Sequence, residues 1–200
     1  MSYEPTVAAA APAPGYPVRL DIDHPEKLSR LLNGLFFIKW IFVIPPYIIL
    51  FLLMGFAYIP IAAFFAILFR RKYPRWWFDA YVNLQRYQLR ITAYLLLLRD
   101  DYPALDEEQA VHLEADYPER LNRWLPLIKW LLVIPHFVVL IVLGILAYVF
   151  VLIGWVAIIF TGNFPRGLFN FVVGVYRWNT RVSAYAFWLA TDQYPPFSMM

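Results

Sequence analysis

Two long stretches without a charged residue constrain the fold of this chain more than any other feature of its sequence. They run from Ile41 to Phe69 and from Leu131 to Phe160, and neither contains Asp, Glu, Lys or Arg. An uncharged run of about 18 residues or more is typical of a membrane-spanning helix. Hydrophobic residues make up 62% of the chain, whereas a soluble domain is about 45–50% apolar. The sequence therefore predicts an integral membrane protein.

The basic residues matter more by their position than by the net charge, which is only +3. They flank the apolar stretches, where Lys and Arg are attracted to anionic lipid headgroups. These residues are Lys27, Arg30, Arg70, Arg71, Lys72, Arg75, Arg120, Arg123 and Arg166. We interpret them as anchors at the membrane surface rather than as a nucleic-acid site.

The two halves of the sequence carry the same landmarks in the same order. The matched groups are Asp23-His24-Pro25-Glu26 with Asp116-Tyr117-Pro118-Glu119, Ile38-Lys39-Trp40 with Ile128-Lys129-Trp130, Val43-Ile44-Pro45 with Val133-Ile134-Pro135, Ala57-Tyr58 with Ala147-Tyr148, Pro74-Arg75 with Pro165-Arg166, and Arg86 and Arg90 with Arg177 and Arg181. Such self-similarity indicates duplication. We predict two tandem membrane repeats, residues 18–105 and 106–200, after a disordered Pro/Ala-rich tail at residues 1–17.

Each repeat is predicted to contain the same series of elements. The expected ranges are extended segments at 18–23 and 111–116, a first helix at 25–43 and 118–133, a long apolar helix at 46–69 and 136–160, and a last helix at 76–98 and 167–190. A helix of about 24 residues is about 36 Å long, enough to cross a bilayer core of about 30 Å. The predicted fold class is therefore an all-α membrane protein, in which each repeat has an interfacial helix, a Pro elbow, a long transmembrane helix and an Arg-striped amphipathic helix.

The last helix of each repeat carries a polar stripe with Arg86 and Arg90 in the first copy and Arg177 and Arg181 in the second. Residues four apart lie on one face of a helix. Such a helix can lie in the headgroup layer, or it can cross the bilayer with its Arg residues facing a wet interior. The sequence does not decide between two and four membrane crossings, or between parallel and inverted repeats. It also allows a long apolar stretch to enter and leave the membrane on the same side.

A recurring Lys-Trp pair precedes each Pro elbow and is a candidate lipid-headgroup site. In an interfacial anchor the Lys extends to the phosphates and the Trp lies at the membrane boundary. The basic residue after each long apolar helix could contact the same headgroup. The candidate residues are Lys39, Trp40, Arg75, Lys129, Trp130 and Arg166.

The sequence predicts no catalytic, metal or cofactor site. His24, His112 and His136 share no metal-ligand spacing, and the chain has no Cys. The acidic residues between the copies are interpreted as a solvated linker: Asp100, Asp101, Asp106, Glu107 and Glu108. Phosphate-binding loops and nucleophile motifs are absent. We therefore expect a protein that is not an enzyme.

The repeated patterns resemble a known family. The Pro-Glu-Lys/Arg-Leu, Ile-Lys-Trp, Phe-Pro-Arg and Arg-Trp-Asn-x-Arg-Val-x-Ala-Tyr patterns are similar to the bacterial membrane family called domain of unknown function 4389. The best stretches are Leu113–His136 and Asn163–Phe197, and the first copy is looser because Gln88 stands where the second has Asn179. The resemblance covers nearly all of the chain after residue 17. It implies a multi-pass protein of a bacterial inner membrane and brings no catalytic residues.

Two hypotheses for the function follow from these features. The first is a non-enzymatic scaffold or accessory subunit that binds anionic lipids and other membrane proteins, or assembles with itself. The alternative is a small transporter or channel with an Arg-lined polar path between the repeats. The second hypothesis requires the four arginines of the polar stripes to face one another inside the bilayer.

Overall fold

The computed structural model describes residues 15–53, 59–105, 107 and 109–200. The tail predicted to be disordered lies mostly outside these residues. The described part is mainly helical. Its elements in chain order are β1 (Val18–Ile22), α1 (Arg30–Gly34), α2 (Phe36–Phe42), α3 (Ile44–Leu52), α4 (Ile59–Arg70), α5 (Arg75–Leu95), β2 (Val111–Ala115), α6 (Leu125–Leu132), α7 (Ile134–Thr161) and α8 (Arg166–Ala186).

The two predicted extended segments form one antiparallel two-stranded sheet. β1 pairs with β2 so that Leu20 lies opposite Leu113 at the centre of the sheet. Apolar side chains alternate along each strand, and those of Val18, Leu20 and Ile22 are buried, as expected for a strand with one covered face. The prediction of short strands is confirmed. The all-α fold class was wrong in leaving out this sheet.

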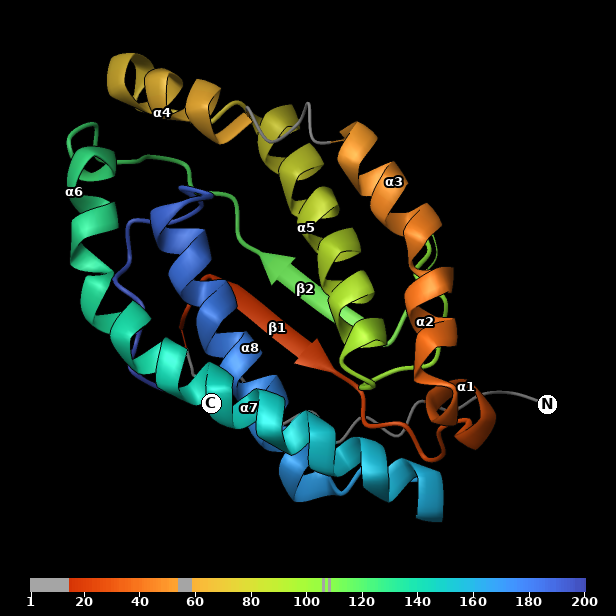
Figure 1. Cartoon of the computed structure of the whole chain (residues 1–200). Helices are drawn as coiled ribbons and strands as arrows, with labels where there is room; N and C mark the ends of the chain where they lie inside the picture. Colours follow the sequence, from red (N-terminus) through yellow and green to blue (C-terminus); the bar gives the residue numbers. More distant parts are fainter. Residues whose placement is uncertain (1–14, 54–58, 106, 108) are drawn as a thin grey trace.

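The helices are arranged in two layers over the sheet (Figure 1). The inner layer contains α5, which contacts β2, and α8, which contacts β1. The outer layer contains α3, which packs on α5, and α7, which packs on α8. Each inner helix therefore lies between the sheet and an outer helix. Each inner helix also covers the strand from the opposite half of the chain.

The second apolar stretch forms the long helix that the sequence predicts. α7 begins at Ile134 with Pro135 in its first turn, where a proline is tolerated, and ends at a left-handed Gly162. Together with α6 it makes one stretch, Leu125–Thr161, that is long and apolar enough to span a membrane. It is the one such stretch among the described residues, so the prediction of a multi-pass protein is not supported.

The first apolar stretch differs from the predicted single helix at 46–69. It contains two shorter helices, α3 and α4, with residues 54–58 outside the described part. Pro60 lies in α4, whose described part begins at Ile59. The matched second stretch has no proline at this point.

The predicted first helices also begin later than expected. Residues 25–29 are not helical, and α1 begins at Arg30 after Ser29, whose hydroxyl accepts a hydrogen bond from the Leu32 backbone N–H at 3.2 Å. In the second half the helix begins at Leu125 instead of residue 118. A side-chain oxygen that caps a helix explains the first of these starts.

The two halves of the chain interlock through matched backbone contacts. The backbone N–H of Leu28 donates to the carbonyl of Gly162 at 2.8 Å, and that of Leu121 donates to the carbonyl of Arg71 at 3.3 Å. Gly162 and Arg71 both have positive φ, 76° and 57°, and each follows an apolar helix. The main hydrophobic core contains residues from both halves. The predicted units 18–105 and 106–200 therefore share one core.

Two glycines of α7 allow a test of this packing. A methyl group on Gly154 would overlap the buried ring of Phe164, whereas one on Gly144 would meet no atom within 4 Å. We expect Gly154→Ala to destabilise the protein by about 1–3 kcal/mol, because overpacking forces the core apart. Gly144→Ala, the matched control, should stabilise it by up to about 1 kcal/mol, because Ala favours a helix more than Gly does. Thermal unfolding in detergent measures both, and equal shifts would contradict the packing described for α7.

Candidate functional site

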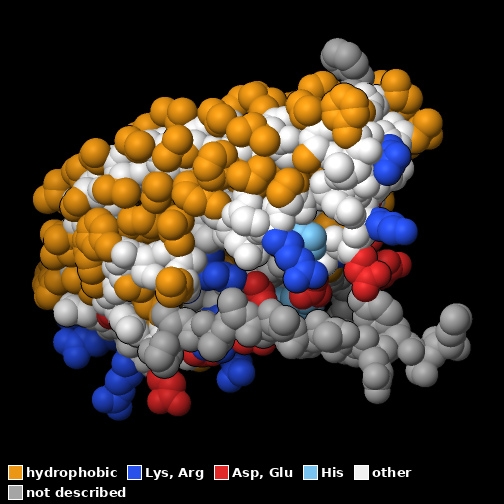
Figure 2. Space-filling model, turned by 90° about the horizontal axis from the view of Figure 1, so that it is seen from below, with side chains coloured by type: hydrophobic (Ala, Val, Ile, Leu, Met, Phe, Trp, Pro, Cys, Tyr) orange, Lys and Arg blue, Asp and Glu red, His pale blue; other side chains and the backbone are white. Residues whose placement is uncertain are grey.

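Apolar and charged side chains gather on opposite sides of the molecule (Figure 2). The apolar side is formed by α2, α3, α4, α6 and α7, on which large hydrophobic side chains are exposed. The charged side includes the sheet, where Arg19 forms ion pairs with Glu114 at 3.1 Å and with Asp116 at 3.0 Å. Exposed apolar area of this extent marks a membrane or protein contact.

α7 contributes most to the apolar side. Only 22% of its most apolar stretch is buried, so it is not the core helix of a soluble domain. Leu140, Ala147, Val151 and Ile158 form a narrow buried stripe along it. Most of its other side chains are apolar and are exposed or half-buried. A helix that is hydrophobic on all sides and covered on one side only is suited to contact lipid.

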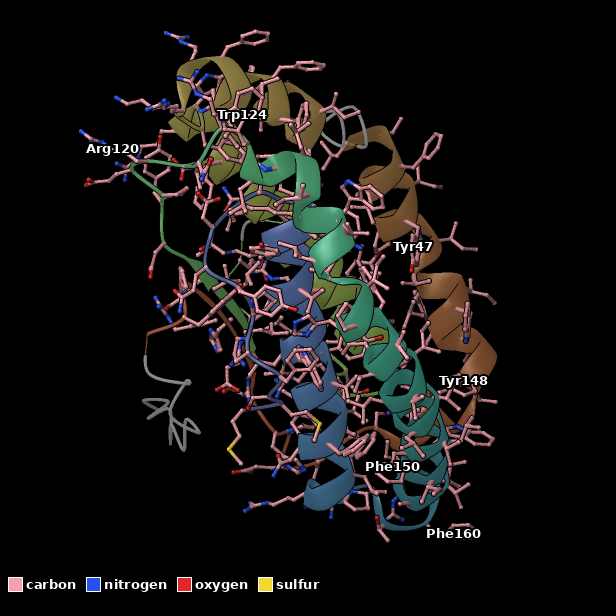
Figure 3. The ribbon with its side chains drawn as sticks, turned by 90° about the vertical axis from the view of Figure 1, so that its left-hand side faces the viewer. Tyr47, Arg120, Trp124, Tyr148, Phe150 and Phe160 are labelled. Carbon is pink, nitrogen blue, oxygen red and sulfur yellow. The ribbon has the colours of Figure 1, made fainter. Side chains whose placement is uncertain are left out.

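Exposed basic residues lie at both ends of the apolar side. At one end the contact between Leu121 and Arg71 brings the segment after β2 to the turn between α4 and α5. The exposed basic residues of this end, which we call the α4–α5 basic end, are Arg70, Arg71, Lys72, Arg75 and Arg120. Trp124 is exposed beside Arg120 (Figure 3). The other end has Lys27, Arg30 and Arg166 exposed.

The predicted lysine anchors do not reach the membrane surface. Lys39 and Lys129 are 1% and 0% exposed, so the interpretation that they extend to lipid phosphates is not supported. Their neighbours Trp40 and Trp130 are 51% and 59% exposed, as expected for interfacial tryptophans. The lysines turn inward because a buried acceptor group is available to each of them.

Lys39 joins α2 to the end of α5. Its ammonium lies 2.7 Å from a carboxylate oxygen of Asp100, donates to the Arg99 carbonyl at 3.0 Å, and lies 4.5 Å from the ring centroid of Tyr94. The other oxygen of Asp100 accepts a hydrogen bond from the backbone of Ser29 at 2.6 Å. Burial lowers the pKa of Lys39, and Asp100 opposes this shift. The carboxylate therefore favours the charged form of the buried amine.

Lys129 makes the matching contacts between α6 and the end of α8. Its ammonium lies 2.8 Å from a carboxylate oxygen of Asp192, donates to the Thr191 carbonyl at 2.6 Å, and lies 4.9 Å from the ring centroid of Tyr185. The other oxygen of Asp192 accepts from the backbone N–H of Asn122 at 2.6 Å. The two ion pairs thus repeat one arrangement in the two halves of the chain.

Asp100 is therefore not part of a solvated linker, which corrects the interpretation of the acidic segment. Its neighbour Asp101 is exposed and pairs with Arg99, and Glu107 is exposed. The other two linker acids, Asp106 and Glu108, lie outside the described residues. Sequence reasoning missed Asp100 and Asp192, although both precede the matched Tyr-Pro pairs that end the two copies.

The remaining two headgroup candidates lie at the surface of the molecule. Arg75 and Arg166 are exposed and begin α5 and α8. The guanidinium of Arg75 also lies 5.3 Å from the ring centroid of Tyr117. Both arginines remain accessible to an anionic group at the two ends of the apolar side.

The first polar stripe packs against the strand from the second half of the chain. Arg86 donates to the carbonyl of Leu113 in β2 at 2.8 Å and to Asn83 at 2.7 Å. Arg90 donates to the carbonyl of Ala104 at 2.7 Å. Neither guanidinium extends toward the apolar side. The stripe instead satisfies backbone carbonyls of the sheet and of the segment after α5.

The second polar stripe repeats this arrangement on β1. Arg177 donates to the Leu20 carbonyl at 2.8 Å and pairs with Asp21 at 2.9 Å. Arg181 is 1% exposed. Burial lowers the pKa of Arg181, and the neighbouring charge of Arg177 adds to this effect. Arg86 and Arg177 therefore bind carbonyls of the sheet, whereas Arg90 and Arg181 bind carbonyls of the segments that follow α5 and α8.

Within the described residues, no group of three or more His, Asp and Glu side chains is placed to hold a metal ion. The three histidines have different contacts. The ring of His24 contacts the carbonyl of Phe164 at 2.9 Å, and that of His112 contacts Asp23 at 3.2 Å. His136 is buried and stacks on Phe197, with ring centroids 3.8 Å apart.

Comparison with known proteins gives one match. A family model described as domain of unknown function (DUF4389) matches residues 123–199. The matched residues contain α6, α7, α8 and the ion pair of Lys129 with Asp192, and they amount to one copy of the family. The predicted resemblance is confirmed for this part of the chain. Neither a curated protein nor a solved structure matches the chain.

The ion pair within the matched region gives a stability prediction. Asp192→Asn leaves the buried Lys129 ammonium without a charge partner. Breaking a buried pair costs about 3–5 kcal/mol, and we expect the lower end of this range because Asp192 is 27% exposed. Chemical unfolding in detergent measures the loss.

Two further variants control this experiment. Asp101→Asn removes an exposed carboxylate that pairs with Arg99, so it should cost less than about 1 kcal/mol. Lys129→Met combined with Asp192→Asn should recover part of the loss, since no buried charge is left unpaired. Equal losses for Asp192→Asn and Asp101→Asn would show that the buried pair has no special role.

Proposed function

We propose that this protein is a non-enzymatic scaffold or accessory subunit of a bacterial inner membrane, held in the bilayer by its apolar side. Its charged side, with the sheet, lies at the aqueous surface and is available to membrane-protein partners or to a second copy. Its basic ends bind anionic lipid headgroups. The separation of apolar and charged side chains onto opposite sides of the molecule is the observation that carries this proposal.

This separation favours insertion from one side of the membrane. The ion pairs of Arg19 with Glu114 and Asp116 lie at one end of the sheet, and placing them in the hydrocarbon core would be costly. With the sheet in water, the apolar helices enter the bilayer and both basic ends lie at the same surface. Exposed tryptophans such as Trp40 and Trp130 are suited to this boundary.

The internal duplication is part of the proposal. The sheet pairs Leu20 with Leu113, which are matched positions of the two sequence halves. Arg86 bonds to Leu113 while Arg177 bonds to Leu20. These reciprocal contacts support two copies related by a pseudo-twofold axis through the sheet. Such an axis, perpendicular to the membrane, would place both copies in the same orientation.

The channel hypothesis receives less support. It requires Arg86, Arg90, Arg177 and Arg181 to converge on a polar path. Each of them donates to a backbone carbonyl of the sheet or of a segment that follows α5 or α8. Arginines that are used in this way are not available to bind a permeating anion.

Labelling from the two sides of the membrane tests the one-sided arrangement. The chain has no Cys, so single cysteines can replace His112 on the sheet, Arg75 and Arg166 at the two ends, and Val142 on α7. We expect a membrane-impermeant maleimide to label the first three from the same side. Val142→Cys should react only after detergent is added, because it lies in lipid.

Two results would contradict this proposal. Labelling of Arg75→Cys and Arg166→Cys from opposite sides would mean that the helices between them cross the membrane, and it would overturn one-sided insertion. Protein that remains strictly monomeric in detergent and copurifies with no membrane protein would count against the scaffold role.

Lipid preference tests the basic ends. Arg70→Gln with Lys72→Gln removes two exposed charges from the α4–α5 basic end. A basic residue near an anionic surface contributes about 1 kcal/mol, so we expect an approximately 30-fold loss of preference for phosphatidylglycerol over phosphatidylcholine. Native mass spectrometry of protein released from mixed-lipid nanodiscs measures this ratio.

The charge-conserving variant Arg70→Lys with Lys72→Arg is the matched control and should keep the preference. An unchanged ratio in the Gln variant would exclude this end as a headgroup site. The result does not depend on the labelling experiment.

A further inference from the structure

A pocket of about 270 Å³ lies between α7 and α8. Its size is slightly below the roughly 300–1,000 Å³ of ordinary ligand pockets. Leu96, which follows α5, closes one side of it, so both halves of the chain contribute to the walls. The residues that line it are Leu96, Leu140, Gly144, Ala147, Tyr148, Val151, Val172, Val175, Tyr176 and Asn179.

Gly144 helps to create this space because glycine has no side chain. A Cβ atom at Gly144 would have no other atom within 4 Å. The first copy carries Met54 at the matched position, three residues before the shared Ala-Tyr pair. The space in the pocket therefore depends on Gly144, a position at which the sequence of the second apolar stretch differs from that of the first.

The pocket extends along α7, and most of the residues that line it are apolar. Its wall on α7 runs from Leu140 to Val151, eleven residues or about 16 Å at the helical rise of about 1.5 Å per residue. Val172 and Val175 of α8 form the facing wall. An unbranched hydrocarbon chain fits this shape better than a compact ring system does.

The pocket adjoins the lipid-facing side of α7. Tyr148, at its edge, is 62% exposed, and Figure 3 places Tyr148 on the outer helix, on the side away from the sheet. The neighbouring Ile141 and Ile145 are 63% and 62% exposed. A lipid in the bilayer could therefore enter from this side without crossing the charged surface.

One end of the pocket carries hydrogen-bonding groups without a charge. Asn179 is exposed there, and its side chain has no hydrogen-bond partner among the residues that the structure describes. Tyr176 adds a hydroxyl on the same helix. No Lys, Arg, His, Asp or Glu lines the pocket. This lining suits a neutral polar group such as an ester, and it lacks the cation that a carboxylate or phosphate requires.

We propose that the pocket binds one acyl chain of an ester-linked membrane lipid, with the ester group at Asn179. The hydrocarbon chain lies along Gly144 between α7 and α8, and the Asn179 amide donates a hydrogen bond to the ester carbonyl. This proposal rests on the proposed membrane location of the apolar side. It assigns to the pocket a role separate from headgroup binding at the basic ends.

Binding of a neutral diacyl lipid to purified protein tests the proposal. Delipidated full-length protein in digitonin, a steroid detergent without an acyl chain, is titrated with dioleoylglycerol and followed by native mass spectrometry. We expect saturable binding of one molecule. Gly144→Phe fills the pocket and should weaken binding at least tenfold, whereas Gly144→Ala should bind like the parent protein.

Two further variants make the test specific. Val142→Phe places the same ring on the exposed face of α7, outside the pocket, and should leave binding unchanged. Asn179→Leu should weaken binding several-fold through loss of one hydrogen bond. Oleate should bind at least tenfold more weakly than dioleoylglycerol, because its carboxylate would be buried without a cation.

Several outcomes would overturn the proposal. Equal binding by Gly144→Phe and the parent protein would show that the lipid lies elsewhere, and thermal unfolding establishes that this variant is folded. Oleate that binds as tightly as dioleoylglycerol would exclude the ester assignment. Because dioleoylglycerol is uncharged and the test uses no bilayer, a failure here is distinguishable from a failure of the labelling or phosphatidylglycerol experiments.

Discussion

The antiparallel pairing of β1 with β2 is the interaction on which the rest of the structure depends. It brings together segments that are more than 90 residues apart, with Leu20 opposite Leu113 at the centre. The central carbonyls then accept hydrogen bonds from Arg177 and Arg86, each from the inner helix over that strand. Because each inner helix crosses to the strand of the other half, neither half can complete its core alone. A short sheet thereby determines where all of the longer helices lie.

The two buried lysines extend this arrangement to the outer layer. Lys39 and Lys129 join α2 and α6 to the ends of α5 and α8 through Asp100 and Asp192. A buried ion pair is weak support for stability by itself, since desolvation offsets much of the attraction. It does fix the position of an apolar helix against the inner layer. The outer helices can therefore keep their apolar surfaces exposed while they stay packed on the inner helices.

The sequence predicts features that depend on local pattern and misses those that depend on distant partners. Alternation of apolar and polar residues predicts both strands, and the uncharged run predicts α7. The inward direction of Lys129 was missed because a Lys-Trp pair beside an apolar stretch is usual at a membrane surface, while its partner Asp192 lies 63 positions away. The matched aspartates that precede Tyr-Pro were the available signal for the ion pairs.

The differences between the halves are as informative as the matches. The landmarks that hold the fold recur in both: the strand residues, the buried lysine, its aspartate and the paired arginines. Two residues of the pocket do not recur, because Gly144 matches Met54 and Asn179 matches Gln88. The matched residues are therefore those that position the helices, whereas Gly144 and Asn179, which line the pocket, belong to the second half alone. A pocket whose polar residue and whose glycine are particular to one half is better explained by a ligand bound there than by the contacts that hold both halves together.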